Sequence, residues 1–391
     1  MLKHTHSDRL ERWLGADKVA AISAHFKDFY WPVPVHGVPG NVRVMPGGDF
    51  TGEINGGAFL SASDGAATVL KKIRSAAESR ARRNNRLGVL ADLIRAEDAR
   101  ILSVGAFASV DAVIAAYTGG KGQTMVFAKT GVASNAMGNS NDLWTRAGMP
   151  VAGAAGSAAP GGVAPTSGTA GNLGFKNLGA ANSGHYLNWS LGASVINNSL
   201  LLYDRLFAVV KTMNSTGTEA VTGVPTRYQS GTAGNNDYIG GNFCFPANPT
   251  TVLAATGHNW TVCQYTDQDS GTSNSFPSVA GVSACVVGGI DLAAGQGSWF
   301  MPLASGDIGV KALTQMQCSA AVATGTIDFV IGHPIAVNAC PVANIACLDD
   351  GLYTSLNLTS ILDGACLSFI ELPKPATTAT TYSGNVRAVS E

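Results

Sequence analysis

Thr326-Ile-Asp-Phe-Val-Ile-Gly-His333 is the stretch that decides the fold, since its β-branched and aromatic residues are typical of a strand. It follows Val310-Lys-Ala-Leu-Thr-Gln-Met-Gln-Cys318, in which apolar and polar side chains partly alternate. The turn Ala323-Thr-Gly325 lies between the two stretches. Alternation with a period of two indicates a half-buried strand, and two strands joined by a glycine-containing turn form a hairpin. The sequence therefore predicts a β-hairpin here.

Shorter strand signals flank this hairpin at intervals of roughly 8–15 residues. They lie around residues 252–263, 281–291 and 298–303. Further upstream, Ser194–Lys211 is almost continuously apolar, and periodicity alone does not decide between two strands and one buried helix. Repeated short strands are typical of a β-sandwich or a jelly roll.

The first 146 residues carry helical patterns instead. Residues 1–30 and 64–84 place apolar side chains at steps of three and four, and residues 88–100 continue in the same way. A short helix is expected from Val110 to Tyr117, closed by a pair of glycines, with a strand following at Gln123–Lys129. These elements predict a mixed helical and strand-containing N-terminal region.

We therefore predict an α+β protein, in which a helical N-terminal portion is followed by a mainly antiparallel, jelly-roll-like β-sandwich. Residues 1–146 are expected to form an α+β domain and residues 185–391 the sandwich. Residues 147–184 are rich in Gly, Ala, Pro, Ser and Thr, which predicts a linker or an extended arm between them.

Charge is scarce in this chain and unevenly distributed. Charged residues make up 13% of the sequence, against about 25% in typical soluble proteins. Residues 147–391 contain 7 of the 25 Lys and Arg residues, so we expect a neutral surface of Ser, Thr, Asn and Gly there. Such a surface loses little hydration energy when another subunit covers it. Because the net charge is −1, nucleic acid is not the expected partner.

One segment concentrates positive charge, on the helix predicted at 64–84. Between Lys71 and Arg86, Glu78 is the single acid. A solvated helix face explains this run, as do contacts with nucleic-acid phosphates or docking on an acidic partner, and the alternatives stay open. Base stacking is not supported, since no aromatic residues are interleaved. The basic residues of this docking helix are Lys71, Lys72, Arg74, Arg80, Arg82, Arg83 and Arg86.

All seven cysteines lie in the last 150 residues. Free cysteines are commonly buried as small hydrophobic residues. A disulfide network formed outside the reducing cytoplasm is the alternative, and an odd count would leave one thiol for a bridge between subunits. The candidates for disulfides are Cys244, Cys263, Cys285, Cys318, Cys340, Cys347 and Cys366.

Motifs of catalysis and cofactor binding are absent from the sequence. It contains no phosphate-binding loop, no Gly-x-Ser-x-Gly elbow and no His-Glu-x-x-His, and Gly295-Gln-Gly297 lacks the third glycine of a dinucleotide loop. His333, Cys340 and Cys347 are too widely spaced for a zinc knuckle. We therefore predict no enzyme activity, no catalytic residue, no metal and no cofactor.

Other polar and aromatic residues have structural explanations. Asp267 and Asp269 fit a plain turn better than a calcium loop. The adjacent Asp204 and Arg205 lie in the most apolar run, which predicts an internal ion pair that fixes a strand register. Tryptophans in a sandwich usually belong to the core, although three could stack on sugars: Trp189, Trp260 and Trp299.

The N-terminal residues and the hydropathy predict that the chain folds in a cytoplasm. The N-terminal residues are polar and lack the apolar region of a secretory signal. No run approaches 18 apolar residues, so no transmembrane helix and no membrane partner are expected.

Two long segments carry a resemblance to a known class of protein. The first runs from Asn198-Ser-Leu-Leu-Leu-Tyr-Asp-Arg to Gln229, and the second from Trp299-Phe-Met-Pro-Leu to Ile335. Both resemble virion structural proteins of tailed bacteriophages, over roughly residues 130–380. The resemblance implies a non-enzymatic particle component with a β-rich body, made in the cytoplasm of a bacterial host and located in the virion.

The predicted function is that of a neck or collar subunit which assembles into a homo-oligomeric ring or sheath. Its partners would be copies of itself and other virion proteins, such as portal, capsid or neck proteins. A capsid-decorating protein is an alternative that needs the same low-charge contact surface. A receptor- or carbohydrate-binding module is a second alternative, and a cell-wall hydrolase is a third.

Overall fold

The computed structural model divides the chain into two compact units, Met1–Leu102 and Ser103–Glu391. In the first unit, β1 (Thr51–Ile54) and β2 (Ala58–Ser61) pair as an antiparallel hairpin. We call the second unit the β-unit. The structure describes residues 51–54, 58–61, 107, 110–133, 138–178, 183–229, 241–267, 271, 273–293, 299–350, 358–372 and 378–390.

The described residues of the β-unit include one short helix. It is α5 (Val110–Ala116), and it continues into the single π-turn η1 (Tyr117–Lys121). Gly120 closes the turn with φ of 90°, a conformation that glycine adopts without steric cost. The helix predicted from Val110 is therefore present. No helix among the described residues is long and apolar enough to cross a membrane.

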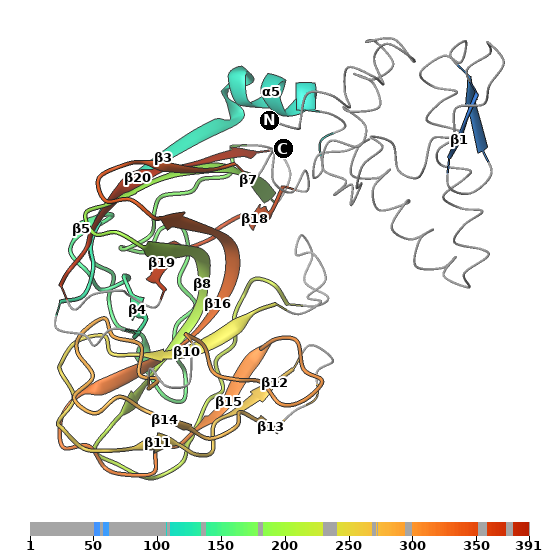
Figure 1. The fold of residues 1–391 in the computed structure, drawn as a ribbon. Coiled ribbons are helices and arrows are strands. Elements are labelled where there is room, and N and C mark those ends of the chain that lie inside the picture. Colours follow the sequence, from blue (N-terminus) through green and yellow to red (C-terminus); the bar gives the residue numbers. More distant parts are fainter. Residues whose placement is uncertain are drawn as a thin grey trace. The chain divides into compact units, whose positions relative to one another are not determined.

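Two sheets form most of the β-unit: in Figure 1 the outer sheet lies at the top, and the central sheet runs from there towards the bottom. The central sheet has the strand order β10-β16-β8-β19-β4, and the outer sheet has the order β17-β7-β20-β3-β5. The pairings along both orders are antiparallel, while β6 (Ser157–Ala158) runs parallel to β8 and β18 (Ser360–Leu362) pairs with β7. The central strands are β10 (Phe243–Ala247), β16 (Thr326–Cys340), β8 (Asn198–Thr212), β19 (Leu367–Glu371) and β4 (Asn141–Asp142). The outer strands are β17 (Cys347–Asp350), β7 (Ser183–Ala193), β20 (Thr381–Ser390), β3 (Gly122–Thr130) and β5 (Gly148–Met149).

The outer sheet packs on one half of the central sheet through a shared apolar core. Trp189 of β7 lies against Phe127 of β3 and Phe369 of β19, with ring centroids 6.2 and 5.5 Å away. All three side chains are at most 1% exposed. Burial of an aromatic side chain contributes a large apolar area, so this trio is a main contact between the two sheets.

The other half of the central sheet packs on smaller strands. A four-stranded sheet has the order β13-β12-β15-β9, and β11 pairs with β14 beside it. Phe329 of β16 meets Trp260 edge to face at 4.7 Å, which joins the two layers. These strands are β13 (Asn274–Ser275), β12 (Gln264–Thr266), β15 (Ala312–Met316), β9 (Glu219–Ala220), β11 (Asn259–Trp260) and β14 (Val279–Ala280).

The long strands β8 and β16 run side by side through both halves and curve together (Figure 1). Their ladder shifts register at two places, beside Gly332 and Ile335. Such bulges bend a strand and let it serve two cores. At Gly332 a Cβ atom would lie 2.7 Å from the Tyr203 ring, so the close approach of the bent strands requires glycine.

The α+β fold class is wrong. Strand accounts for 43% of the interpretable residues and helix for 5%. The helices predicted at 1–30, 64–84 and 88–100 lie outside the described residues. Instead, β3 and β4, which belong to the predicted N-terminal domain, pair with strands from the C-terminal end of the chain.

The hairpin predicted from 310 to 333 is also wrong, although both of its strands exist. β15 pairs with β12 and β9, whereas β16 pairs with β10 and β8. The glycine turn between them therefore connects two different sheets. The local pattern identifies strands, but the choice of partner depends on distant segments.

Residues from the segment predicted as a linker or arm lie against the central sheet. Ser157 and Ala158 pair with Val209 and Val210 of β8. Val163 makes an isolated bridge with Ala208 in the same strand. These residues cover β8, which also contacts its neighbours in the central sheet. For this reason β8 is buried almost throughout and its apolar and polar residues do not alternate.

Candidate functional site

A buried charge cluster lies where the central sheet passes from one core to the other. Arg205 of β8 donates to Asp142 of β4 at 2.7 Å and to Asp328 of β16 at 3.2 Å. The Tyr203 hydroxyl donates to the same Asp142 carboxylate at 3.0 Å. The Arg205 guanidinium also lies 5.0 Å from the centre of the Trp144 ring. We call these residues the junction cluster.

Electrostatics in the junction cluster depend on Arg205. Burial raises the pKa of Asp328, and the Arg205 charge opposes that rise. Asp328 Oδ2 accepts from the Gly156 amide, whereas Asp328 Oδ1 has no hydrogen-bond partner among the described residues. Burial likewise lowers the pKa of the nearby Lys129 to about 8 despite Asp142. The cluster thus holds one guanidinium between two carboxylates away from water.

Asp204 belongs to a separate ion pair, on the opposite side of β8. Arg227 donates to both oxygens of the Asp204 carboxylate, from Nε at 2.9 Å and from Nη2 at 2.7 Å. The Cys366 amide also donates to this carboxylate, at 2.8 Å. The predicted Asp204–Arg205 pair is therefore wrong, because successive side chains of a strand point to opposite faces. Each residue instead pairs with a partner distant in the sequence.

Beside this pair, the His333 ring stacks on Tyr228, with centroids 3.9 Å apart and planes at 14°. His333 Nδ1 lies 2.7 Å from Asn242 Oδ1 and donates to it. Tyr228 has a positive φ of 53°, which a non-glycine residue seldom adopts, and the stack and the Arg227 pair hold it there. Burial lowers the pKa of His333 to about 4, although Asp204 acts in the opposite direction.

The lowered pKa of His333 predicts acid destabilisation. Between pH 6.5 and about 4 the unfolded chain binds a proton at this residue that the folded chain does not, so stability falls as the pH decreases. The loss should reach about 3 kcal/mol at pH 4 and be absent above pH 6.5. Urea unfolding of the wild type and His333→Asn, which keeps a donor for Asn242, measures it. A difference between the two that is independent of pH would contradict the prediction.

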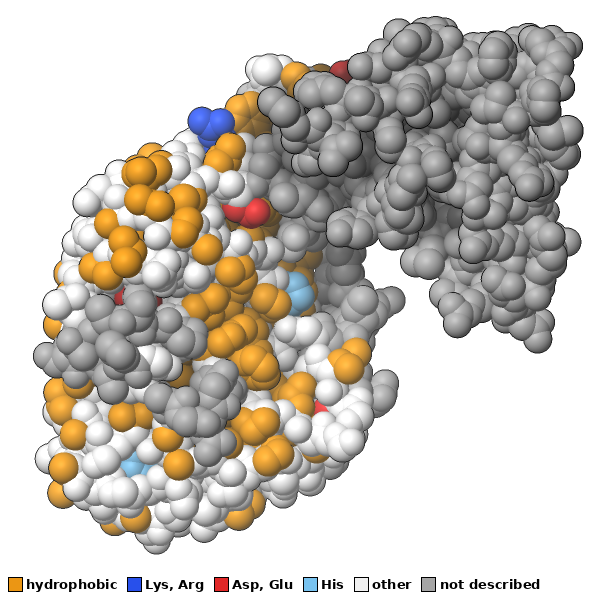
Figure 2. All heavy atoms as spheres, in the orientation of Figure 1, with side chains coloured by type: hydrophobic (Ala, Val, Ile, Leu, Met, Phe, Trp, Pro, Cys, Tyr) orange, Lys and Arg blue, Asp and Glu red, His pale blue; other side chains and the backbone are white. Residues whose placement is uncertain are grey.

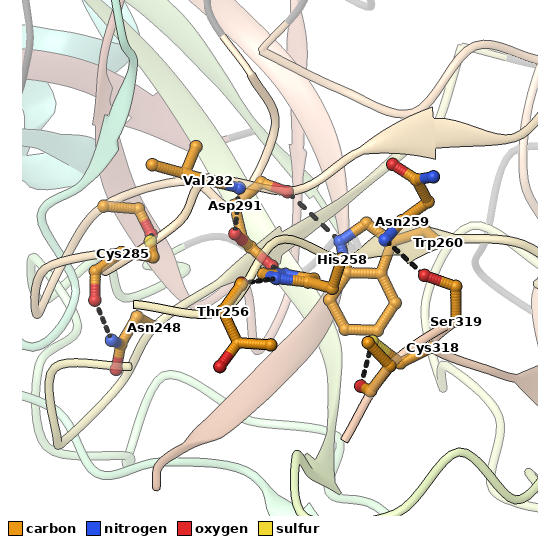
Figure 3. A network of polar contacts seen from close by, with 12 residues as sticks. Asn248, Thr256, His258, Asn259, Trp260, Val282, Cys285, Asp291, Cys318 and Ser319 are labelled. Carbon is orange, nitrogen blue, oxygen red and sulfur yellow. Dashed lines mark hydrogen bonds and ion pairs between the residues drawn. The ribbon is translucent and has the colours of Figure 1, made fainter. Parts of the chain in front are cut away.

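A second buried pair, His258 and Asp291, has the composition of a catalytic dyad (Figure 3). Nε2 of His258 lies 2.8 Å from Asp291 Oδ2, and Nδ1 lies 3.1 Å from the Thr256 carbonyl oxygen. Asp291 Oδ1 accepts from the Val282 amide at 2.6 Å. Burial lowers the His258 pKa, but the hydrogen bond and charge of Asp291 outweigh it, so the pKa is raised. Both ring nitrogens therefore act as donors.

The thiols nearest this pair are not prepared for nucleophilic attack. Cys285 Sγ donates to the Gly289 carbonyl at 3.5 Å, and Cys318 Sγ donates to the Ala320 carbonyl at 3.2 Å. Burial raises the pKa of both thiols, so they stay protonated at neutral pH. A charged imidazolium with both nitrogens occupied cannot accept a proton from them, and the arrangement is that of a structural ion pair.

The surface contains fewer charges than the composition suggests. Of the seven Lys and Arg residues in 147–391, Arg205, Lys211 and Arg227 are buried. Lys176 and Arg387 are exposed, and Lys311 is half-buried. Figure 2 accordingly shows uncharged and hydrophobic side chains over most of this face of the β-unit.

The outward face of the outer sheet carries exposed apolar and uncharged polar side chains. A cross-strand row runs from Leu348 through Ser190 and Asn385 to Val126. Leu348 and Val126, at the two ends, are 65% and 55% exposed. Among the described outward-facing residues of β7, β20 and β3, the one Lys or Arg is Arg387, the partner of Asn188 and Thr124. Large exposed apolar side chains on a sheet face with few charges are typical of contact surfaces.

Next to this face, the turn from β16 to β17 forms an apolar corner. Residues 334–348 contain no charged residue. The apolar corner is defined by four exposed side chains: Val337, Val342, Ile345 and Leu348. Leu348 belongs to both, so the apolar corner borders the outward face.

The predicted site residues are distributed as follows. The docking helix, Lys71 to Arg86, lies outside the described residues. All seven cysteines are free thiols, six are buried and Cys347 is half-buried. Trp189 and Trp260 are buried, and Trp299 is packed against the aromatic ring of Phe243 at 4.7 Å.

The residues weighed as metal ligands do not converge on one point. His333 binds Asn242, whereas Cys340 donates to backbone carbonyls at the apolar corner. Asp267 accepts from the Gly271 amide and from Asn274, as in a plain turn. Within the described part of the chain, no group of three or more His, Cys, Asp or Glu could hold a metal ion.

Comparison with known proteins identifies no family for this chain. No family model matches the chain, and no curated protein matches it. Two solved structures from infectious bursal disease virus, one of the Gt strain and one of the VP2 subviral particle, each align over 69% of this chain and 81% of their own. Identity is 11% in both, with TM-scores of 0.12 and 0.13. At such scores the likeness supports no conclusion about fold or function.

Proposed function

We propose that this chain is a structural subunit of a virus particle, and that it acts by packing the neutral face of its outer sheet against copies of itself. The observation that carries this proposal is the burial of Arg205, Lys211 and Arg227, which leaves few cations on the described surface of residues 147–391. A face with few charges loses little hydration energy in a contact, so small gains in packing suffice.

The position within a particle follows from the sequence resemblance to tailed-phage virion proteins. A neck or collar ring fits a subunit whose faces repeat around an axis, because heterologous contacts between identical copies close into rings. A capsid-decorating protein would use the same neutral surface on a lattice of other subunits. Copy number in purified particles distinguishes the two, since decorating proteins follow the number of capsid subunits.

The three tryptophans considered as sugar-stacking residues do not favour a carbohydrate-binding module. Trp189 and Trp260 are 0% and 1% exposed, so neither can stack on a sugar. The ring of Trp299 is engaged by Phe243 and Phe300 at 4.7 and 4.8 Å. These tryptophans stabilise the core instead.

Charge placed on the neutral face tests the proposal. Val126→Asp should raise the dissociation constant of the oligomer at least about 100-fold, because an unpaired carboxylate in a contact loses its hydration. Thr216→Asp adds the same charge to an exposed loop of the β-unit and is the matched control. Sedimentation velocity over a concentration series measures both. Equal association of the two variants would remove the face from the proposal.

A further inference from the structure

Two thiols meet at the apolar corner. Cys340 is the last residue of β16 and Cys347 is the first residue of β17. Their sulfur atoms share one acceptor, the Ile345 carbonyl oxygen, at 3.3 Å from Cys340 and 4.0 Å from Cys347. The fold therefore brings this pair together across a loop of six residues.

The backbone around the pair is held on both sides. Cys347 pairs with Leu191 of β7, and Cys340 pairs with Asn198 of β8. The Asn338 amide group bridges the strands by donating to the carbonyls of Cys347 at 3.2 Å and Trp189 at 2.9 Å. Because these contacts fix both strands, the sulfur atoms stay close without a covalent bond.

Accessibility distinguishes this pair from the other thiols. Of the seven cysteines, all within the described residues, only Cys347 is not buried. A reagent in solution can therefore reach Cys347 first, and Cys340 lies directly behind it. Desolvation and the neighbouring Cys340 raise the pKa of the Cys347 thiol, so exchange has to proceed through a small thiolate fraction; exposure and an adjacent resolving thiol are the features that favour this pair.

We propose that Cys340 and Cys347 form a reversible disulfide that closes the loop 341–346. The Cys347 thiolate attacks a small-molecule disulfide of the glutathione type, and one thiolate leaves. The Cys340 thiolate then attacks the Cys347 sulfur of the mixed disulfide, and the second thiol leaves. Two protein thiols are oxidised by two electrons, and one external disulfide is reduced to two thiols.

The bond would fix the segment that presents Val342 and Ile345. Under the proposed function, on which this consequence rests, oxidation after release from a reducing cytoplasm would lock the apolar corner in one conformation. A conformation fixed in advance reduces the entropy lost when a neighbour binds.

Incubation of the full chain with oxidised and reduced glutathione tests the bond. Intact mass should fall by two hydrogen atoms, and peptide mapping should find Cys340 linked to Cys347. The oxidised chain should melt about 3 °C higher, and Cys347→Ser should show neither change while it melts like the reduced wild type.

Three results would overturn the inference: an unchanged mass, a glutathione adduct that persists on Cys347, or a bridge to another copy. Sedimentation velocity measures assembly of the chain separately from bond formation. A bond that forms in a chain which never associates would contradict the proposed function alone, whereas an assembling chain without the bond would contradict this inference alone.

Discussion

Replacement of Arg205 by methionine is expected to cost about 3–5 kcal/mol of unfolding free energy. The substitution leaves the Asp142 and Asp328 carboxylates buried, 3% and 1% exposed, without their cation. Methionine keeps the apolar stem of the side chain but not the guanidinium, so the unpaired carboxylates account for most of the loss. Chemical denaturation at pH 7 measures it directly.

Two further variants separate this effect from a general sensitivity to substitution. Lys176→Met removes an exposed cation and should change stability by less than about 0.5 kcal/mol. Adding Asp142→Asn and Asp328→Asn to Arg205→Met should restore most of the loss, because no buried charge remains unpaired. A cost below about 1 kcal/mol for Arg205→Met alone would show that the junction cluster is hydrated.

Truncation of Trp189 to alanine should cost about 3–5 kcal/mol as well. Its ring is fully buried and touches Phe127 of the outer sheet and Phe369 of the central sheet. The substitution opens a cavity at the contact between the sheets, which the rigid strands cannot close.

Trp189→Phe is the matched variant, since it keeps an aromatic ring and removes only part of the volume. It should cost clearly less than Trp189→Ala, and thermal or urea unfolding compares them. Equal losses from both variants would mean that packing between the sheets does not depend on the size of this ring.

The sequence predicts individual strands well where one face is exposed. Gln123–Lys129 alternates and is found in β3, and the short helix after Ser109 ends at its glycines. β8 could not be distinguished from a buried helix, because contacts on both faces remove the alternation that would identify it. Partner choice was not predictable, since β15 and β16 are close in sequence but belong to different sheets.

The buried charges gave a partial signal. Asp204, Arg205 and Asp328 each interrupt an apolar run, which indicates a satisfied internal charge. Asp142, a partner of Arg205, and Arg227, the partner of Asp204, lie far away in the sequence or in segments without a strand pattern. The His258–Asp291 pair gave no local signal at all, because its members are 33 residues apart and meet only through tertiary packing.

Sedimentation velocity of the purified full chain, at about 0.1 M and about 1 M sodium chloride, tests the central claim most directly. Contacts between neutral faces are not screened, so a closed oligomer of the same size should be present at both salt concentrations. A monomer at every protein concentration and in both salts would contradict the account.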